Sequence, residues 1–414
     1  MSASDTPRGV PPAALPIEHD AIALADRIAR GELSASEALE AAIERCETVN
    51  PHVNAVCNPA FELARGEARA IDAELGTARR YAGAVLALRR QRPFLGVPSL
   101  LKDLSTAATG LPSTMGSRLF GRIEWPHDCE LVTRYRRAGL VFFGRTTSPE
   151  MGIRPSTQAV AYGGPTRNPW SLGHSAGGSS GGAGAAVAAD IVTLAHASDG
   201  AGSIRIPATN CGLFGLKPSR GLMPAGPLAG EGWGGLATEH FLTRSVRDSA
   251  LALDVSAGAD VGAPYAAPPR PPSYLELTEL ALQQDLPLKR RIRLRIACSW
   301  RTLDGDEVHP DVAAAVREAA LLLESMGHIV AEAAPRMRTL DVLRPMLEII
   351  ASGTALAVEQ FERQRGRPAS ADELEPTTRS AVAFGRGLSA PQYLDAIGKV
   401  HRSAREVDRF MQAD

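Results

Sequence analysis

Cysteine is scarce in this sequence, and the few cysteines are scattered. The 414 residues contain five of them, none in a C-x-x-C pair: Cys46, Cys57, Cys129, Cys211 and Cys298. This pattern argues against a paired-cysteine zinc site and a disulfide framework, and predicts a reducing, cytoplasmic compartment. The nine histidines are also dispersed. With no ligand spacing among histidine, cysteine and carboxylate residues, we expect neither a metal nor another cofactor, and structural roles for His174, His196 and His240.

The sequence also lacks a charge excess and a long apolar run. The formal net charge is −1, and no basic stripe is present of the kind that binds nucleic acid. No segment is long and apolar enough to span a bilayer, and the first 16 residues have no apolar stretch after a basic start. We therefore expect neither a nucleic-acid partner nor a membrane partner, which leaves a small molecule.

Local patterns predict an α/β protein. The capping box Ser34-Ala35-Ser36-Glu37 starts a helix that should end at Asn50-Pro51. Short apolar runs then alternate with turns and helices, as is typical of an α/β sheet. The expected strands cover residues 140–144, 191–197 and 292–298, and further helices are expected over 58–76, 311–326 and 391–411.

Changes in composition suggest how the chain is organised. We expect a disordered, proline-rich leader over residues 1–16 and a helical segment over 17–95 that packs on the core. A catalytic core follows over 96–414. Within it, the proline-rich residues 262–273 form a linker or a long surface loop.

Glycines surround Ser179 in the run Gly177 to Gly182. A phosphate-binding loop would need a lysine after the glycines, but Ala183-Gly184 follows instead. The pattern G-x-S-x-G, typical of a hydrolase nucleophile elbow, matches around both Ser179 and Ser180. That elbow needs a strand that runs directly into the serine, whereas residues 165–171 have the composition of a loop.

A second serine and a lysine complete the set of candidate catalytic groups. The strand expected before Ser198-Asp199 leads through a Gly-Ala-Gly turn to Ser203, where several backbone N–H groups could stabilise an oxyanion. Alternatively, Ser203 simply caps a helix. Lys102 follows an apolar stretch, where desolvation would lower its pKa and make it a base. Alternatively, it is an ordinary surface lysine. Each of these residues has a structural alternative, so only the occurrence of Lys102, Ser179 and Ser203 together indicates a catalytic site.

Taken together, these motifs resemble the amidase signature family, and most closely its members of the 6-aminohexanoate cyclic dimer hydrolase type. The resemblance covers about residues 20–414, and the 24-residue spacing of Ser179 and Ser203 matches the family. The matching motifs include Gly96-Val97-Pro98 with Lys102-Asp103, residues 144–150, Arg167-Asn168-Pro169-Trp170, Gly177 to Gly182, Asp199 to Ala208, and Cys211 to Pro218.

The resemblance implies both a fold and a mechanism. The fold would be a large, mixed, twisted sheet covered by helices, with additional N-terminal helices. Ser203 would be the nucleophile, Ser179 the bridging serine after a cis peptide bond to Gly178, and Lys102 the base. The remaining roles would be oxyanion-binding N–H groups at Gly200, Ala201, Gly202 and Ser203, and support of the site by Ser180, Asp199 and Arg205.

The implied activity is hydrolysis of a small carboxylic amide other than a peptide, with linear or cyclic amide oligomers and esters among the candidate substrates. The family also contains an amidotransferase subunit that works with partner proteins. That subunit has glutamine where this chain has Ile206, which disfavours the alternative. The resemblance also leaves open a homodimer and a bacterial source.

Two features depart from the family pattern. Ala201 lies in the turn before Ser203 where many members have glycine, which would strain the turn if its φ were positive. The helix expected over residues 391–411 ends close to Asp414, whereas family members continue into further elements. The resemblance thus implies that the C-terminal part of the fold is missing, and predicts a weakly stable product with low activity or an inactive truncated amidase.

Overall fold

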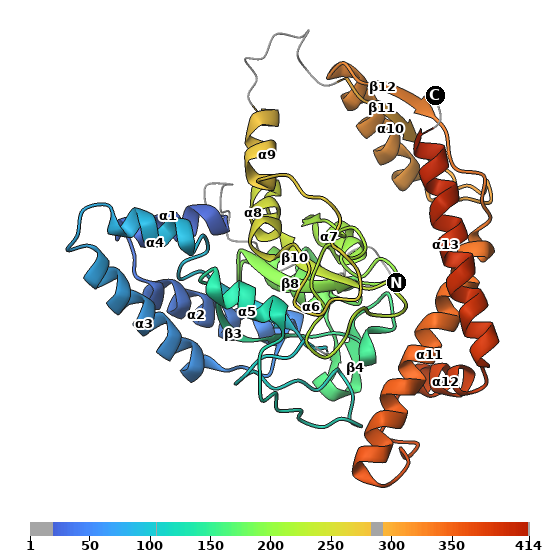
Figure 1. The fold of residues 1–414 in the computed structure, drawn as a ribbon, viewed down its shortest axis with the longest axis horizontal. Coiled ribbons are helices and arrows are strands. Elements are labelled where there is room, and N and C mark those ends of the chain that lie inside the picture. The colour runs from blue at the N-terminus through green and yellow to red at the C-terminus, as the bar shows by residue number, and fades with distance from the viewer. Residues whose placement is uncertain (1–19, 105, 283–292, 413–414) are drawn as a thin grey trace. The chain divides into compact units, whose positions relative to one another are not determined.

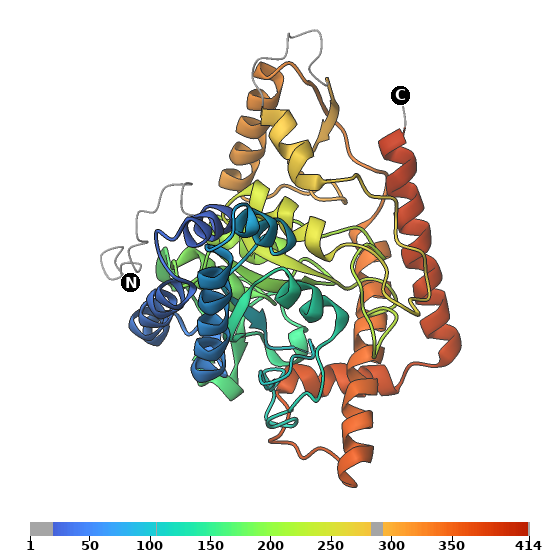
Figure 2. The same cartoon turned by 60° about the vertical axis from the view of Figure 1, so that its left-hand side comes forward.

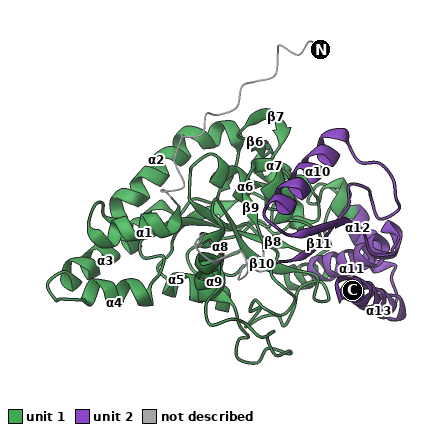
Figure 3. Ribbon diagram, turned by 90° about the horizontal axis from the view of Figure 1, so that it is seen from above, with its two compact units in different colours: residues 1–280, 359–379 green, residues 281–358, 380–414 purple. Residues whose placement is uncertain are grey.

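A computed structural model describes residues 20–104, 106–282 and 293–412. The predicted leader over residues 1–16 lies outside the described residues. Two compact units are distinguished in Figure 3: residues 1–280 with 359–379, and residues 281–358 with 380–414. The division proposed at residue 95 stays a prediction.

Four helices begin the first unit: α1 (Ala21–Arg30), α2 (Ala35–Val53), α3 (Phe61–Ala78) and α4 (Ala84–Gln91). The predicted capping box starts α2, because the Ser34 hydroxyl accepts the Glu37 N–H and the Glu37 carboxylate accepts the Ser34 N–H. The predicted end at Asn50-Pro51 was wrong by almost one turn. Pro51 lies in the last turn, and the helix ends where Asn54 adopts a left-handed conformation and donates to the Asn50 carbonyl.

Two three-stranded sheets lie at the centre of this unit (Figure 1). In one, β3 (Val141–Thr146) lies between β1 (Val56–Cys57) and β2 (Pro98–Lys102), antiparallel to β1 and parallel to β2. In the other, β10 (Thr238–Thr243) pairs antiparallel with both β8 (Leu194–Asp199) and β9 (Phe214–Gly215). The hydroxyl of Ser99 on β2 donates to the carbonyl of Leu194 on β8 at 3.0 Å, which ties the two sheets together.

The α/β class is confirmed, but some boundaries differ from the prediction. Strand β8 begins at Leu194 rather than Ile191, because Asp190 adopts a left-handed φ of 59° in a turn that delays the strand. Residues 165–171, expected to be a loop, take part in short hairpins. These are formed by β4 (Gln158–Ala159) with β5 (Gly164–Pro165) and by β6 (Arg167–Asn168) with β7 (Ser171–Ser175).

Helices cover these sheets and bury their apolar faces. In Figure 2 the N-terminal helices lie together beside the strands, and one core cluster joins Leu39 of α2 and Leu75 of α3 to Phe143 of β3. A second cluster contains Leu101, Tyr135 and Phe241. The other helices of this unit are α5 (Glu130–Arg137), α6 (Gly181–Ala188), α7 (Arg205–Cys211), α8 (Val246–Ser256) and α9 (Tyr274–Leu282), with the proline-rich residues 262–273 as a loop between the last two.

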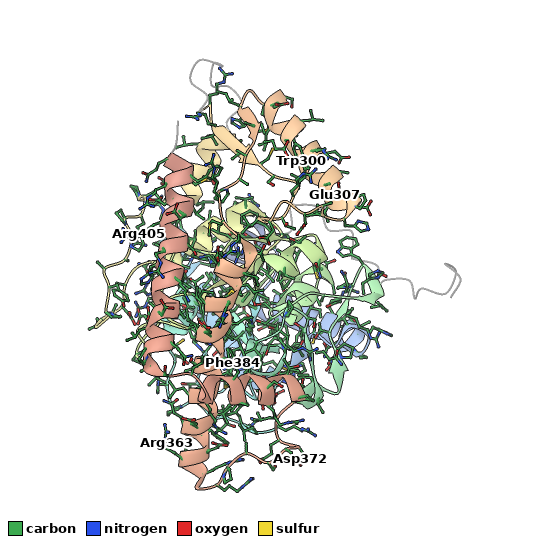
Figure 4. All side chains as sticks on the ribbon, turned by 90° about the vertical axis from the view of Figure 1, so that its right-hand side faces the viewer. Trp300, Glu307, Arg363, Asp372, Phe384 and Arg405 are labelled. Atoms are coloured by element: carbon green, nitrogen blue, oxygen red, sulfur yellow. The ribbon has the colours of Figure 1, made fainter. Side chains whose placement is uncertain are left out.

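The second unit contains a parallel strand pair. Strands β11 (Arg295–Cys298) and β12 (Ile329–Glu332) are connected by α10 (Pro310–Ser325), close to the predicted strand and helix. Helices α11 (Thr339–Arg365), α12 (Pro376–Arg386) and α13 (Ala390–Gln412) follow, with residues 359–379 assigned to the first unit. Trp300, labelled in Figure 4, lies 4.8 Å beneath the guanidinium of Arg317 in a cation–π contact.

Candidate active site

Strand β2 delivers Lys102 to the centre of the first unit. All five residues of this strand are buried, because sheet partners and helices cover both of its faces. The Lys102 ammonium nitrogen Nζ lies 2.7 Å from the Ser179 hydroxyl and 2.9 Å from the Ser198 hydroxyl. The side chain is fully buried, so its hydrogen bonds are made away from bulk water.

Burial changes the acidity of Lys102. Desolvation disfavours the ammonium form and lowers its pKa to about 7, although the carboxylates of Glu239 and Asp199 act in the opposite direction. The structure therefore supports a buried lysine over an ordinary surface lysine. Near neutral pH a large fraction of Lys102 is neutral, and a neutral amine can accept a proton.

Ser179 lies in the turn between β7 and α6. The Gly178–Ser179 peptide bond is cis, as the resemblance implied. The Ser179 carbonyl accepts a hydrogen bond from Thr157 Oγ1 at 3.3 Å, and Thr157 Oγ1 accepts the Gly181 N–H at 3.0 Å. These contacts fix the turn on both sides of Ser179, so that its hydroxyl faces Lys102.

The second turn leads from β8 to α7 and carries Ser203. Asp199, at the end of β8, accepts the N–H groups of Gly202 at 2.6 Å and Ile204 at 3.1 Å. The two turns contact each other, since the Ser180 N–H donates to the Ser203 carbonyl at 3.2 Å and the Ser180 hydroxyl donates to the Ser198 carbonyl at 3.1 Å. Figure 1 shows α6 and α7 beside β8 and β10.

The N–H groups of this turn differ in their availability. Gly202 was expected to bind an oxyanion, but its N–H donates to Asp199, so that part of the expectation needs correction. Among the described residues, no protein acceptor receives the N–H groups of Gly200, Ala201 or Ser203. Gly202 has a φ of 117°, whereas Ala201 is not among the described non-glycine residues of positive φ, so it does not strain the turn.

Several residues near Lys102 escaped the sequence prediction. Ser198 lies beside Nζ, and His196, expected to be only structural, accepts the Lys102 backbone N–H at 3.3 Å. Both face Lys102 from β8, and the alternation of side chains along a strand could have linked them if the strand had been placed correctly. The ring of Trp233 packs over Gly200. The backbone of Trp233 has a φ of 49°, which is rare for a bulky residue.

Within residues 20–104, 106–282 and 293–412, no group of three or more histidine, cysteine, aspartate or glutamate side chains could hold a metal ion. In the same ranges, no helix combines the length and apolar character that crossing a membrane requires. The expected lack of a cofactor stays a prediction.

Comparison with known proteins identifies the family of this chain. The Amidase family matches residues 37–413. The chain is 37% identical over 401 residues to a 6-aminohexanoate-cyclic-dimer hydrolase of Pseudomonas sp. (strain NK87), a match that covers 95% of this chain and 75% of that protein. It is 39% identical over 315 residues to an acylamidase of Rhodococcus erythropolis, which covers 76% of this chain and 61% of that protein.

Solved structures lead to the same conclusion. The fold matches that of a 6-aminohexanoate cyclic dimer hydrolase with a TM-score of 0.82 at 35% identity, covering 96% of this chain and 78% of the other. A bacterial aryl acylamidase of the amidase signature family matches with a TM-score of 0.78 at 27% identity, covering 91% and 74%. The chain belongs to the amidase family, within its amidase signature group, and is an amidase that hydrolyses amide bonds other than peptide bonds.

Proposed function

We propose that this amidase cleaves small carboxylic amides through an acyl-enzyme on Ser203, with Ser179 and Lys102 as the proton relay. The observation that carries the proposal is the 2.7 Å contact between Lys102 Nζ and the Ser179 hydroxyl, made by a buried lysine of lowered pKa. A buried neutral amine beside a serine hydroxyl is a suitable general base.

The proton moves in two linked steps. Neutral Lys102 takes the proton of Ser179, and Ser179 takes the proton of Ser203 as the Ser203 oxygen attacks the amide carbon. The carbonyl oxygen then becomes an oxyanion, and the N–H groups of Gly200, Ala201 and Ser203 donate to it. These donors have no protein acceptor among the described residues, which leaves them available for substrate.

The second half of the reaction releases both products. The relay runs in reverse and protonates the leaving nitrogen, so the C–N bond breaks and an ester to Ser203 remains. Water then attacks this ester, gives up a proton to the relay and restores the Ser203 hydroxyl as the carboxylic acid leaves. Asp199, Arg205 and Ser180 hold the two turns in place through their hydrogen bonds.

We propose small linear or cyclic carboxylic amides as the substrate class. Two curated relatives are named as 6-aminohexanoate-cyclic-dimer hydrolases, and another is named as an acylamidase. A direct test measures product release by chromatography from the 6-aminohexanoate cyclic dimer, a linear aliphatic amide and an anilide. Turnover of at least one amide, absent in Ser203→Ala, supports the proposal; amide turnover that survives in Ser203→Ala contradicts it.

We also infer a cytoplasmic location, because the described cysteines are unpaired. A homodimer stays a prediction, which sedimentation analysis of the purified protein would test. A partner-dependent amidotransferase is disfavoured by Ile206, as argued from the sequence. Turnover by the purified chain alone would distinguish the two functions.

A further inference from the structure

A histidine and a glutamate lie behind Lys102, on the face of the sheet that it contacts. Strands β8 and β10 run antiparallel with Glu239 opposite Ser198 and with Phe241 opposite His196. Residues that face each other across a ladder, and alternate residues along one strand, project to the same side. Because Ser198 contacts Lys102 Nζ at 2.9 Å, this shared side is the one that faces the base.

His196 lies between Glu239 and Lys102, with a hydrogen bond to Lys102 and a longer contact to Glu239. The Lys102 backbone N–H donates to His196 Nδ1 at 3.3 Å. A neutral imidazole that accepts at Nδ1 carries its proton on Nε2, and Nε2 lies 3.5 Å from the Glu239 carboxylate. The ring is completely buried, and Tyr135 and Phe241 each lie 6.1 Å from it between ring centres, so its orientation is fixed.

Glu239 differs from the other nearby carboxylate in what it binds. Asp199 is occupied by Arg205 and by backbone N–H groups. Among the described residues, Glu239 has no arginine or lysine ion-pair partner; it contacts His196 at 3.5 Å and accepts a long hydrogen bond of 3.4 Å from Thr106. The negative charge of Glu239 therefore acts mainly on His196 and on the buried Lys102.

The pKa of Glu239 is consistent with this arrangement. Burial alone would raise it, but His196 and Lys102 together lower it below its usual value, so Glu239 is an anion at neutral pH. In return, its charge raises the pKa of Lys102 against the larger effect of desolvation. The other charged or titratable groups around this pair and Lys102 are Cys129, Tyr135, Arg145, Asp199 and His240, whereas α6 contributes only glycine, alanine and valine.

We propose that Glu239 and His196 form a positioning pair that holds Lys102 against Ser179 and supplies the negative charge it faces. The inference rests on the proposed role of Lys102 as the base. Neither residue touches the substrate in this account. Without the pair, the end of β2 that carries Lys102 is held less firmly, and Lys102 becomes a weaker base.

The test is the pH dependence of kcat/KM in Glu239→Gln, which keeps the size of the side chain and removes its charge. Because a carboxylate stabilises the ammonium form, its loss should move the acid-side inflection to lower pH by about one unit. The weaker base should also lower the plateau of kcat by roughly tenfold. Glu239→Asp, which restores the charge, should move the inflection back toward that of the unaltered enzyme.

Two controls separate this inference from the function on which it rests. Glu231→Gln removes an exposed carboxylate shortly before β10 and should leave the profile unchanged. If Lys102→Ala keeps full activity, the assignment of Lys102 as the base is wrong. If Lys102→Ala is inactive while Glu239→Gln matches the unaltered enzyme in inflection and plateau, the positioning pair alone is overturned. A folded Glu239→Asp that has a profile no closer to the unaltered enzyme than Glu239→Gln would also overturn it.

Discussion

Arg205 binds Asp199 through two hydrogen bonds of 2.9 Å, across the turn that carries Ser203. The Asp199 side chain is completely buried, whereas that of Arg205 is 53% exposed. Burial alone would raise the pKa of Asp199, but Arg205 and the N–H groups of the turn lower it, so the carboxylate stays charged. This ion pair joins the end of β8 to the start of α7 and thereby fixes the position of Ser203.

Asp199→Asn should therefore reduce both activity and stability. The amide loses the charge and one of the acceptor positions used by Arg205 and the Gly202 N–H, and hydrogen bonds to charged groups contribute about 2 kcal/mol each. We expect kcat to fall by roughly a hundredfold and the free energy of unfolding to fall by about 2 kcal/mol. Steady-state kinetics and urea unfolding measure both. Arg205→Lys, which retains the charge, is the milder control, and unchanged kcat in Asp199→Asn would contradict this role.

The lowered pKa of Lys102 predicts how activity depends on pH. The neutral amine is the active form, so kcat/KM should rise with pH through about 7 and then level off. Lys102→Ala should lose about two to four orders of magnitude in kcat, because it deletes the proton acceptor. A flat profile between mildly acidic and alkaline pH, or unchanged kcat in Lys102→Ala, would show that Lys102 is not the base.

The lowered pKa of Lys102 should also make stability rise with pH. Its folded pKa of about 7 lies below its ordinary value of 10.5, so between these pH values the unfolded chain binds the extra proton. This group therefore adds stability as pH rises across that window, by about 1.4 kcal/mol per unit. Lys102→Met removes the buried amine and should be inactive yet more stable at pH 7. Equal or lower stability of Lys102→Met in urea unfolding would contradict the prediction.

Much of this site could be predicted from local sequence. Lys102, Ser179 and Ser203 each lie in a short motif, and a turn or strand end is determined largely by the residues within it. Glu239 could not be linked to Lys102 in this way, because their proximity depends on the register of β10 against β8. The engagement of the Gly202 N–H by Asp199 likewise depends on the exact path of the turn.

In the fold, as in the site, the features set by local sequence could be predicted, and those set by long-range pairing could not. Helix α2 begins at its capping box because that signal is local. The start of β8 was predicted three residues too early, because the apolar residues Ile191 and Val192 precede the strand. The number of strands in each hydrogen-bonded sheet depends on long-range pairing. No periodic pattern marks Trp233, which lies in a loop and reaches the active site only through tertiary packing.

Gly200 and Trp233 provide a test of packing at the oxyanion turn. A Cβ added at Gly200 would lie 2.6 Å from the Trp233 ring, closer than real side chains approach, so Gly200→Ala must displace the ring or the turn. We expect a loss of roughly tenfold or more in kcat. Adding Trp233→Leu should recover part of the loss by making room. Full activity of Gly200→Ala alone would show that the turn tolerates the shift.

The dispersed histidines and cysteines predict a reaction that needs no metal. Activity should be unchanged after dialysis against a chelator such as EDTA, when compared with the same protein dialysed against buffer. A loss of activity that added zinc restores would contradict this prediction.

Covalent labelling tests the central claim most directly. A fluorophosphonate captures the serine that attacks an electrophilic centre, and mass spectrometry of the digested protein identifies the residue that carries the adduct. We predict a single adduct on Ser203, absent in Ser203→Ala and formed far more slowly in Lys102→Ala. An adduct on Ser179 or Ser180, with undiminished labelling of Ser203→Ala, would contradict the assignment of the nucleophile.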